Sequence, residues 1–168
     1  MNRAFVKEPD EGAPAESLPE RQISEHQNFV TPAGLRELET RVGELETRRL
    51  ELLDEDNVAD ELAYVDRDLR YYTARLESAV LVDPARQPRR KVAFGAAVTV
   101  SQPGGKRQTF TIVGEDEADL ATLKVSCVSP LAEALIGARV GDRVVWRRPA
   151  GDLELTVTAI AYDGHRAD

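Results

Sequence analysis

The stretch that decides the fold is TPAGLRELETRVGELETRRLELLDEDNVADELAYVDRDLRYYTARLESAV, residues 31–80. It opens with a hydroxyl residue followed by proline, a pair typical of the N-cap and first turn of an α-helix. Apolar residues then recur at steps of three and four in two series, as on the buried face of paired helices. The first series is Leu35, Leu38, Val42, Leu45 and Leu52, and the second is Val58, Leu62, Val65, Leu69, Tyr72 and Leu76. The pattern predicts helices over about residues 32–53 and 58–80.

The connection between the two predicted helices is only about four residues long, near residues 54–57. A connection this short leaves the helices antiparallel. Residues 29–83 are therefore predicted to form an antiparallel coiled-coil hairpin. Each helix of about 22 residues is then about 33 Å long at the α-helical rise.

The segments on either side of the hairpin differ in composition. Residues 1–28 are rich in proline and glutamate without helical or strand periodicity, and we expect a disordered acidic tail there. Two prolines and four basic residues in 84–91 predict the end of the second helix and a basic linker. From residue 92 to residue 163 the apolar period changes to two, which predicts a small β-sheet domain.

The β domain is expected to hold five strands and one short helix. The strands are predicted at 92–100, 107–113, 123–127, 143–148 and 153–160. Ser129 and Pro130 predict the cap and first turn of a helix that ends at Gly137. The acidic segment GEDEAD, residues 114–119, is interpreted as an ordinary loop between strands. The expected fold class is α+β, with an N-terminal helical hairpin followed by a β-sheet domain.

The composition excludes several classes of protein. No apolar run approaches the roughly 18 to 20 residues of a membrane helix, and the acidic start lacks a secretory signal pattern, so we expect a cytoplasmic location. Cys127 is the single cysteine and His26 and His165 are the only histidines, which excludes a disulfide framework and a structural zinc site within one chain. Without a paired nucleophile and base or a glycine-rich phosphate loop, the sequence does not predict an enzyme.

The net charge of −8 is concentrated at the predicted hairpin tip, where residues 51–61 contain six acids and no base. The acids at 60–61 suit the first turn of the second helix, with Asn57 as a candidate cap. Glu51 and Asp54 instead lie at the C-terminal end of the first helix, where the helix dipole disfavours negative charge. Such clustered acids indicate ligands for Mg²⁺ or a patch that enters a basic channel, and a plain solvated turn is the alternative.

Six stretches carry a further signal. They are VTPAGL (30–35), DRDLRYYTARLES (66–78), FGAAVTV (94–100), IVGEDEAD (112–119), VSPLAEALIGARVGD (128–142) and TVTAI (156–160). In content and order they resemble the GreA/GreB transcript-cleavage factors of bacterial RNA polymerase. The run SPxAxALIGxxVGD beside IVGEDEAD is the specific part of this resemblance, which spans about residues 29–162.

The resemblance implies an FKBP-like C-terminal domain over residues 92–163. This domain would dock on bacterial RNA polymerase through Ser129, Pro130 and Leu131. The hairpin would then enter the secondary channel of the polymerase, with indirect contact to the transcript RNA.

The resemblance also implies a role for the tip. In the family, acids at the tip help hold a Mg²⁺ ion at the polymerase active centre, so that the polymerase cleaves its own backtracked RNA. The residues implied here are Asp54, Glu55, Asp56 and Glu51. We expect a monomer that is not itself an enzyme, binds no metal stably when alone, and shares only the Mg²⁺ of the polymerase.

Two departures from the family pattern keep other functions open. The family tip usually reads GDxSENAEY, whereas this chain has LDEDNVADELAY at residues 53–64, and its hairpin is about two turns per arm shorter. The tip would then end about 10–15 Å short, which would abolish cleavage unless the docking shifts. A channel-occupying regulator or inhibitor that does not stimulate cleavage is therefore the alternative. More remote alternatives are a peptidyl-prolyl isomerase-like enzyme, suggested by the FKBP-like domain alone, and a structural module that dimerises through Leu50 and Leu53.

Overall fold

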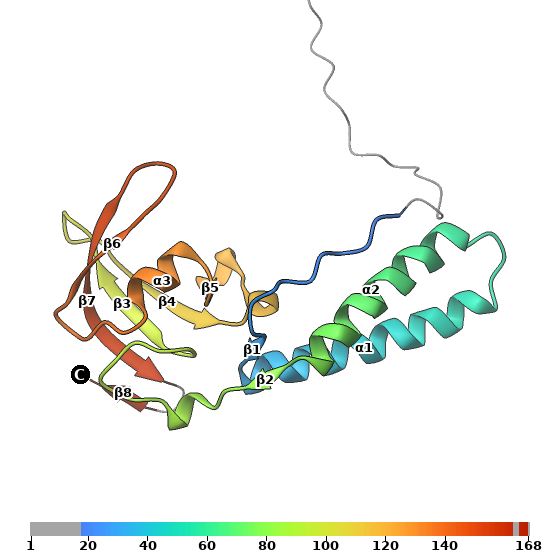
Figure 1. Ribbon diagram of the computed structural model, residues 1–168, viewed down its shortest axis with the longest axis horizontal. Helices are drawn as coiled ribbons and strands as arrows, with labels where there is room; N and C mark the ends of the chain where they lie inside the picture. Colours follow the sequence, from blue (N-terminus) through green and yellow to red (C-terminus); the bar gives the residue numbers. More distant parts are fainter. Residues whose placement is uncertain (1–17, 163–164, 168) are drawn as a thin grey trace, which may run out of the picture.

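The protein, seen in a computed structural model, is described over residues 18–162 and 165–167. Its two long helices, α1 (Pro32–Leu53) and α2 (Ala59–Glu77), lie antiparallel and project from one side of a curled β domain (Figure 1). The predicted α+β fold, a helical hairpin followed by a small β-sheet domain, is confirmed.

Helix α1 has the predicted bounds because its N-terminus is defined by neighbouring residues. The Thr31 hydroxyl accepts a hydrogen bond from Gly34 N at 3.0 Å, and Pro32 occupies the first helical position. Proline lacks the N–H that would otherwise be unsatisfied there, so the pair begins the helix at this point.

The predicted apolar seam forms the core of the hairpin. Leu45, Leu52 and Val65 are buried between the two helices. Partly buried residues of the same seam pack around them, namely Val58, Leu62, Leu69 and Tyr72. The helical period of the sequence therefore identified the contact face of both helices.

Helix α2 is shorter at both ends than the predicted range 58–80. Asn57, the predicted cap, has a φ of 62° and lies in the turn, so Val58 takes the N-cap position without a side-chain hydrogen bond. The prediction of Asn57 as a cap is wrong because the turn needs a residue that tolerates the left-handed region, which asparagine does.

A short parallel strand pair closes the base of the hairpin. Strand β1 (Phe29–Val30) precedes α1 and strand β2 (Val80–Leu81) follows α2, with Phe29 opposite Val80. Val80 N donates to Asn28 O at 2.8 Å. Helix α2 ends before residue 80 because this backbone group bonds to the N-terminal segment instead of continuing the helix.

The β domain is one six-stranded sheet in the order β5-β4-β3-β7-β6, with β8 paired to β7. The strands are β3 (Ala97–Ser101), β4 (Arg107–Val113), β5 (Lys124–Ser126), β6 (Arg143–Trp146), β7 (Leu153–Tyr162) and β8 (His165–Ala167). Its helical turns are α3 (Pro130–Leu135), η2 (Pro84–Arg86), η3 (Glu115–Glu117) and η4 (Leu120–Thr122). Within this sheet, as far as the structure describes it, β4 and β5 are the only neighbours that pair in parallel. Helix α3 packs on one face of the sheet and shares its core, which includes Val98, Val100, Phe110, Ile112, Leu131, Leu135, Leu155, Val157 and Ile160.

All five predicted strands occur, but several have different limits. The first begins at Ala97 instead of residue 92, because the chain turns at Gly95, where φ is 85°. The strands predicted at 123–127 and 143–148 are shorter, whereas β7 continues to Tyr162. Strand β8 is an addition to the predicted set.

Residues 18–28, part of the predicted disordered tail, run along α2 to the base of the hairpin, and we call this segment the strap (Figure 1). The Arg21 guanidinium lies 3.8 Å from the ring centroid of Tyr71 and 3.6 Å from Asp68 Oδ1. The expectation of a tail without fixed contacts is wrong for the strap, because its charged side chains find partners on α2. Residues 1–17, the rest of the predicted tail, lie outside the described residues.

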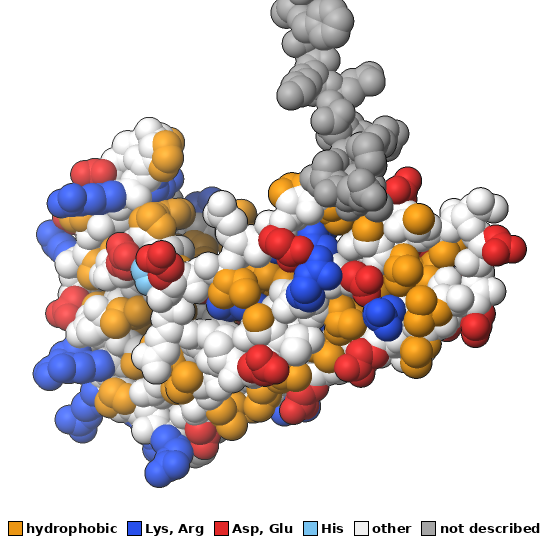
Figure 2. All heavy atoms as spheres, turned by 45° about the vertical axis from the view of Figure 1, so that its right-hand side comes forward, with side chains coloured by type: hydrophobic (Ala, Val, Ile, Leu, Met, Phe, Trp, Pro, Cys, Tyr) orange, Lys and Arg blue, Asp and Glu red, His pale blue; other side chains and the backbone are white. Residues whose placement is uncertain are grey.

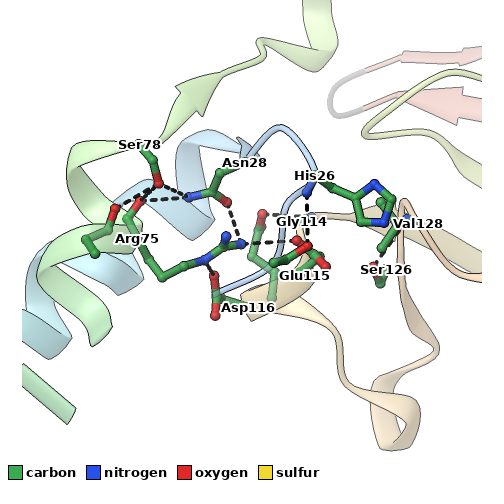
Figure 3. A network of polar contacts seen from close by, with 12 residues as sticks. His26, Asn28, Arg75, Ser78, Gly114, Glu115, Asp116, Ser126 and Val128 are labelled. Carbon is green, nitrogen blue, oxygen red and sulfur yellow. Dashed lines mark hydrogen bonds and ion pairs between the residues drawn. The ribbon is translucent and has the colours of Figure 1, made fainter. Parts of the chain in front are cut away.

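A group of polar side chains, which we call the clamp, joins the hairpin to the β domain. Its members are Asn28, Thr31, Tyr71, Arg75, Glu115, Asp116 and Glu117. Arg75 is 1% exposed, and its Nε donates to Asp116 Oδ2 at 2.6 Å (Figure 3). Its Nη2 donates to Asn28 Oδ1 at 2.7 Å and to Glu115 Oε2 at 3.4 Å. A guanidinium is buried favourably only when it is paired in this way, so these bonds fix α2 against η3.

Tyr71 adds a second bond from α2 to the same carboxylate. Its hydroxyl donates to Asp116 Oδ1 at 2.7 Å. Burial, and then this hydrogen bond, raises the pKa of Tyr71 to about 12, so the hydroxyl stays protonated and donates at neutral pH. Both oxygens of Asp116 are therefore held by residues one helical turn apart on α2.

Glu117 holds the start of α1. Thr31 N and Gly114 N donate to Glu117 Oε2, each at 3.1 Å, and the Thr31 hydroxyl donates to Glu117 Oε1. This hydroxyl is the same one that caps α1. The interpretation of residues 114–119 as an ordinary loop is wrong, because consecutive acids in this segment bind both helices of the hairpin.

Gly34→Ala is expected to lower the free energy of unfolding, although alanine is the better helix former. A Cβ atom at Gly34 would lie 2.1 Å from Glu117 Cδ, so Glu117 must move and lose its bonds to Thr31 and Gly114. Urea denaturation measures the change.

Gly43→Ala is the matched control on the same helix. A Cβ atom at Gly43 has nothing within 4 Å, so this change should raise the free energy of unfolding by up to about 1 kcal/mol. A Gly34→Ala protein as stable as Gly43→Ala would contradict the role assigned to Glu117.

Candidate functional site: the hairpin tip and the docking surface

The four predicted tip acids lie together at the far end of the hairpin. Glu51 is in the last turn of α1, and Asp54 is the C-cap of that helix. Glu55 and Asp56 follow in the turn, and all four side chains are exposed. Figure 2 shows acidic side chains at the right-hand end of the hairpin, whereas Lys and Arg gather on the β domain at the left. The tip is therefore an acidic surface that points away from the β domain.

Arg48 organises part of this acidic surface. Its Nη1 lies 3.2 Å from Glu51 Oε2 and 3.5 Å from Glu55 Oε1. Its Nη2 lies 2.8 Å from Glu61 Oε1, across the hairpin on α2. The hydrogen bonds to Glu61 and Glu51 raise the pKa of Arg48, so it stays a cation at the centre of three acids.

Arg48 was not among the site residues predicted from the sequence. Its spacing of three residues from Glu51 is a recognised signal for an ion pair on one helix face. The contact with Glu61 joins two helices, and only the folded hairpin brings these residues together.

Asp54, Asp56 and Asp60 differ from the three acids around Arg48. Within the part of the chain that the structure describes, they take part in no ion pair. Asp54 also lies at the C-terminal end of α1, where the helix dipole adds negative potential. These carboxylates can therefore attract a cation presented by a partner.

The exposed tip carries carboxylates, which are one kind of ligand that Mg²⁺ takes in proteins. Mg²⁺ in proteins is usually bound by one or two carboxylates together with phosphates and waters. Asp54 and Asp56 can supply such carboxylates from an exposed turn. In residues 18–162 and 165–167, no three His, Cys, Asp or Glu side chains are grouped to hold a metal ion.

The predicted docking residues lie at the start of α3. The Ser129 hydroxyl accepts a hydrogen bond from Ala132 N at 3.2 Å, and Pro130 is exposed. Leu131 is only 3% exposed and belongs to the core of the β domain. The prediction of Leu131 at the surface is wrong, because a short helix on a sheet must bury one apolar side.

Two exposed apolar residues beside α3 were not predicted from the sequence. Ile136 is 45% exposed and Val140 is 49% exposed. Each precedes a glycine with positive φ, Gly137 at 88° and Gly141 at 94°. An apolar residue before such a turn is the sequence signal, and both side chains lie on the exposed surface beside α3.

Polar groups elsewhere have structural partners. A cavity of about 210 Å³ beside the clamp is lined in part by Asp116 and Glu117, but both carboxylates are already hydrogen-bonded within the clamp. Burial raises the pKa of the Cys127 thiol, which therefore stays protonated at neutral pH.

Over the described residues, no helix combines the length and apolar character needed to cross a membrane.

Comparisons with known proteins identify relatives of the chain. Residues 87–162 match the family described as "Transcription elongation factor, GreA/GreB, C-term". The transcription elongation factor GreB of Neisseria meningitidis serogroup B (strain ATCC BAA-335 / MC58) is 37% identical over 157 residues, covering 83% of this chain and 96% of that protein. The transcription elongation factor GreA of Alkalilimnicola ehrlichii is 38% identical over 105 residues, covering 61% of this chain and 66% of that protein.

Solved structures were also matched. The transcription elongation factor GreA/GreB from Nitrosomonas europaea has a TM-score of 0.41 at 22% identity, covering 80% of this chain and 99% of that chain. GreA factor homolog 1 of Thermus thermophilus has a TM-score of 0.40 at 24% identity, covering 81% of this chain and 99% of that chain. The sequence matches carry the assignment: with 37% identity across 96% of the Neisseria protein, the chain belongs to the GreA/GreB family of transcription elongation factors.

Proposed function

We propose that the protein binds bacterial RNA polymerase through its β domain and extends the hairpin into the secondary channel of the enzyme. There the tip acids promote the polymerase's own cleavage of backtracked RNA. Family membership supports an elongation factor. The observation that carries the proposal is the clamp, which holds an acid-tipped hairpin in a set direction from the β domain.

The chemical contribution of this chain is to position carboxylates. A Mg²⁺ ion held at the polymerase active centre would supply an activated water by lowering the pKa of that water. Asp54 and Asp56 would share that ion, because they are exposed and have no ion-pair partner in the described part of the chain. The polymerase supplies the remaining ligands and remains the catalyst.

A second candidate is a regulator that occupies the channel without stimulating cleavage. Helices α1 and α2 have 22 and 19 residues, or about 33 and 28 Å, which gives the tip a limited reach. Arg48 also engages Glu51 and Glu55, two of the four predicted tip acids. Both observations favour occupancy over direct contact with the metal ion.

Replacing Asp54, Glu55 and Asp56 by Ala should abolish the effect of the protein on transcription without unfolding it. Exposed turn residues change the free energy of unfolding by no more than about 0.5 kcal/mol each, and removing like charges relieves repulsion. The measurement is RNA cleavage and RNA extension by stalled elongation complexes. Lost cleavage supports the Mg²⁺ role, and lost inhibition supports occupancy.

The matched control replaces Glu39, Glu44 and Glu46 by Ala, which removes the same charge from exposed positions along the shaft of α1. Arg48→Ala separates the two candidates further, because freeing Glu51 and Glu55 should increase cleavage only if the acids reach the metal ion. If the triple tip variant binds polymerase and matches the wild type in both assays, the tip acids have no functional role. The tip is then an ordinary solvated turn.

Pro130→Asp should weaken binding to core RNA polymerase more than the triple tip variant does. The change puts a charge on the exposed side of α3, while aspartate in a first helical turn is compatible with the fold. Pull-down or fluorescence titration with polymerase measures the loss.

Val145→Asp is the control for the docking surface. Val145 is 50% exposed, and its neighbours Val144 and Trp146 turn toward the core, so Val145 faces the other side of the sheet from α3. Equal loss of binding in both variants, or in neither, would count against docking at α3.

A further inference from the structure

The strap contacts α2 at a residue that belongs to the clamp. The Arg21 guanidinium stacks on the ring of Tyr71 at 3.8 Å from the centroid and lies 4.9 Å from that of Tyr72. Asp68, one turn earlier on α2, pairs with the same guanidinium at 3.6 Å. The planar guanidinium is suited to an aromatic face flanked by a carboxylate.

Tyr71 connects the strap to the β domain. Arg21 covers one face of its ring, while its hydroxyl donates to Asp116 Oδ1 at 2.7 Å. Arg75, one turn later, bonds the other oxygen of Asp116 at 2.6 Å. Arg21 therefore limits access of water to the side chain through which α2 reaches the β domain.

The other end of the strap enters the same network. Asn28 Oδ1 accepts from Arg75 Nη2 at 2.7 Å, and Asn28 Nδ2 donates to the Arg75 carbonyl oxygen at 2.7 Å (Figure 3). These contacts form one connected network. Tyr71 and Arg75 bond Asp116 of the β domain, and the strap contacts the same two residues through Arg21 and Asn28. Rotation of the hairpin away from the β domain must break the bonds to Asp116.

We propose that the strap is a brace that keeps the hairpin at a fixed angle to the β domain, with Arg21 as its positioning residue. The length of the hairpin makes this angle important. For an arm of about 33 Å, a rotation of about 10° at the base moves the tip by about 6 Å. A carboxylate must come within about 2.1 Å of Mg²⁺ to bind it, so a loosened base takes the tip acids out of reach.

The brace can be tested on the full chain in the absence of polymerase. Nitroxide labels are attached at Leu50→Cys on α1 and Leu120→Cys on the β domain, in a Cys127→Ala background. Pulsed electron paramagnetic resonance then measures the distance between the hairpin and the β domain. Both label sites are well exposed, at 64% and 82%. We expect a single narrow distribution of label-to-label distances with the native strap and a broader distribution in Arg21→Ala.

Two further variants show whether the effect belongs to Arg21. Arg148→Ala removes an arginine of the β domain that lies 5.2 Å from the ring centroid of Trp146, away from the strap, and should leave the distance narrow. Arg21→Lys keeps the charge but loses the planar stack, so it should give an intermediate width. An Arg21→Ala distribution equal to that of the native strap, or equal broadening in Arg148→Ala, would overturn the brace.

The link from the brace to transcription rests on the proposed function and is measured separately. Arg21→Ala should bind polymerase as well as the native chain does and lose its effect in the stalled-complex assay. A broadened distance with an undiminished transcription effect would overturn the positioning role of Arg21. A native chain without any transcription effect would refute the proposed function, while the distance measurement would still decide on the brace.

Discussion

The buried ion pair between Arg75 and Asp116 is the interaction on which the arrangement of the molecule depends. The Arg75 side chain is 2% exposed and that of Asp116 is 15% exposed, at a separation of 2.6 Å. Removing one partner of such a pair leaves an uncompensated buried charge, which typically costs about 3–5 kcal/mol. An apolar contact of similar area would tolerate sliding, whereas directional bonds to both oxygens of Asp116 define one orientation of α2 on the β domain.

The rest of the molecule divides into three parts, and each part has a separate role. The β domain carries the proposed docking surface at α3, where Pro130, Ile136 and Val140 are exposed. The clamp and the strap set the direction of the hairpin from its base. The tip carries exposed acids, of which Arg48 engages Glu51, Glu55 and Glu61, while Asp54 and Asp56 face solvent. The proposed action on RNA polymerase needs all three parts of the molecule. A hairpin whose base can move cannot hold the tip carboxylates at a fixed position.

The parts of this arrangement that depend on neighbouring residues could be predicted from the sequence. Helix α1 was predicted with its observed bounds, because its cap and its apolar period are both local signals. The clamp could not be predicted, since Arg75 and Asp116 are 41 residues apart and each is an ordinary charged residue in its own segment. Leu131 was wrongly predicted to lie at the surface. The cap and proline indicate where α3 begins, but they do not indicate which side of the helix packs on the sheet. The strap was misread for a related reason: polar, proline-rich composition is typical of disorder, and the face of Tyr71 that holds Arg21 exists only after α2 forms.

A double-mutant cycle on Arg75 and Asp116 tests the central claim most directly. The free energies of unfolding of the native chain, Arg75→Met, Asp116→Ala and the double variant are measured by urea denaturation. If the pair holds the hairpin on the β domain, the double variant should lose less than the sum of the single losses, with a coupling energy of about 1–3 kcal/mol. Single losses that add to within about 0.5 kcal/mol would show that the two residues act independently and would contradict the clamp.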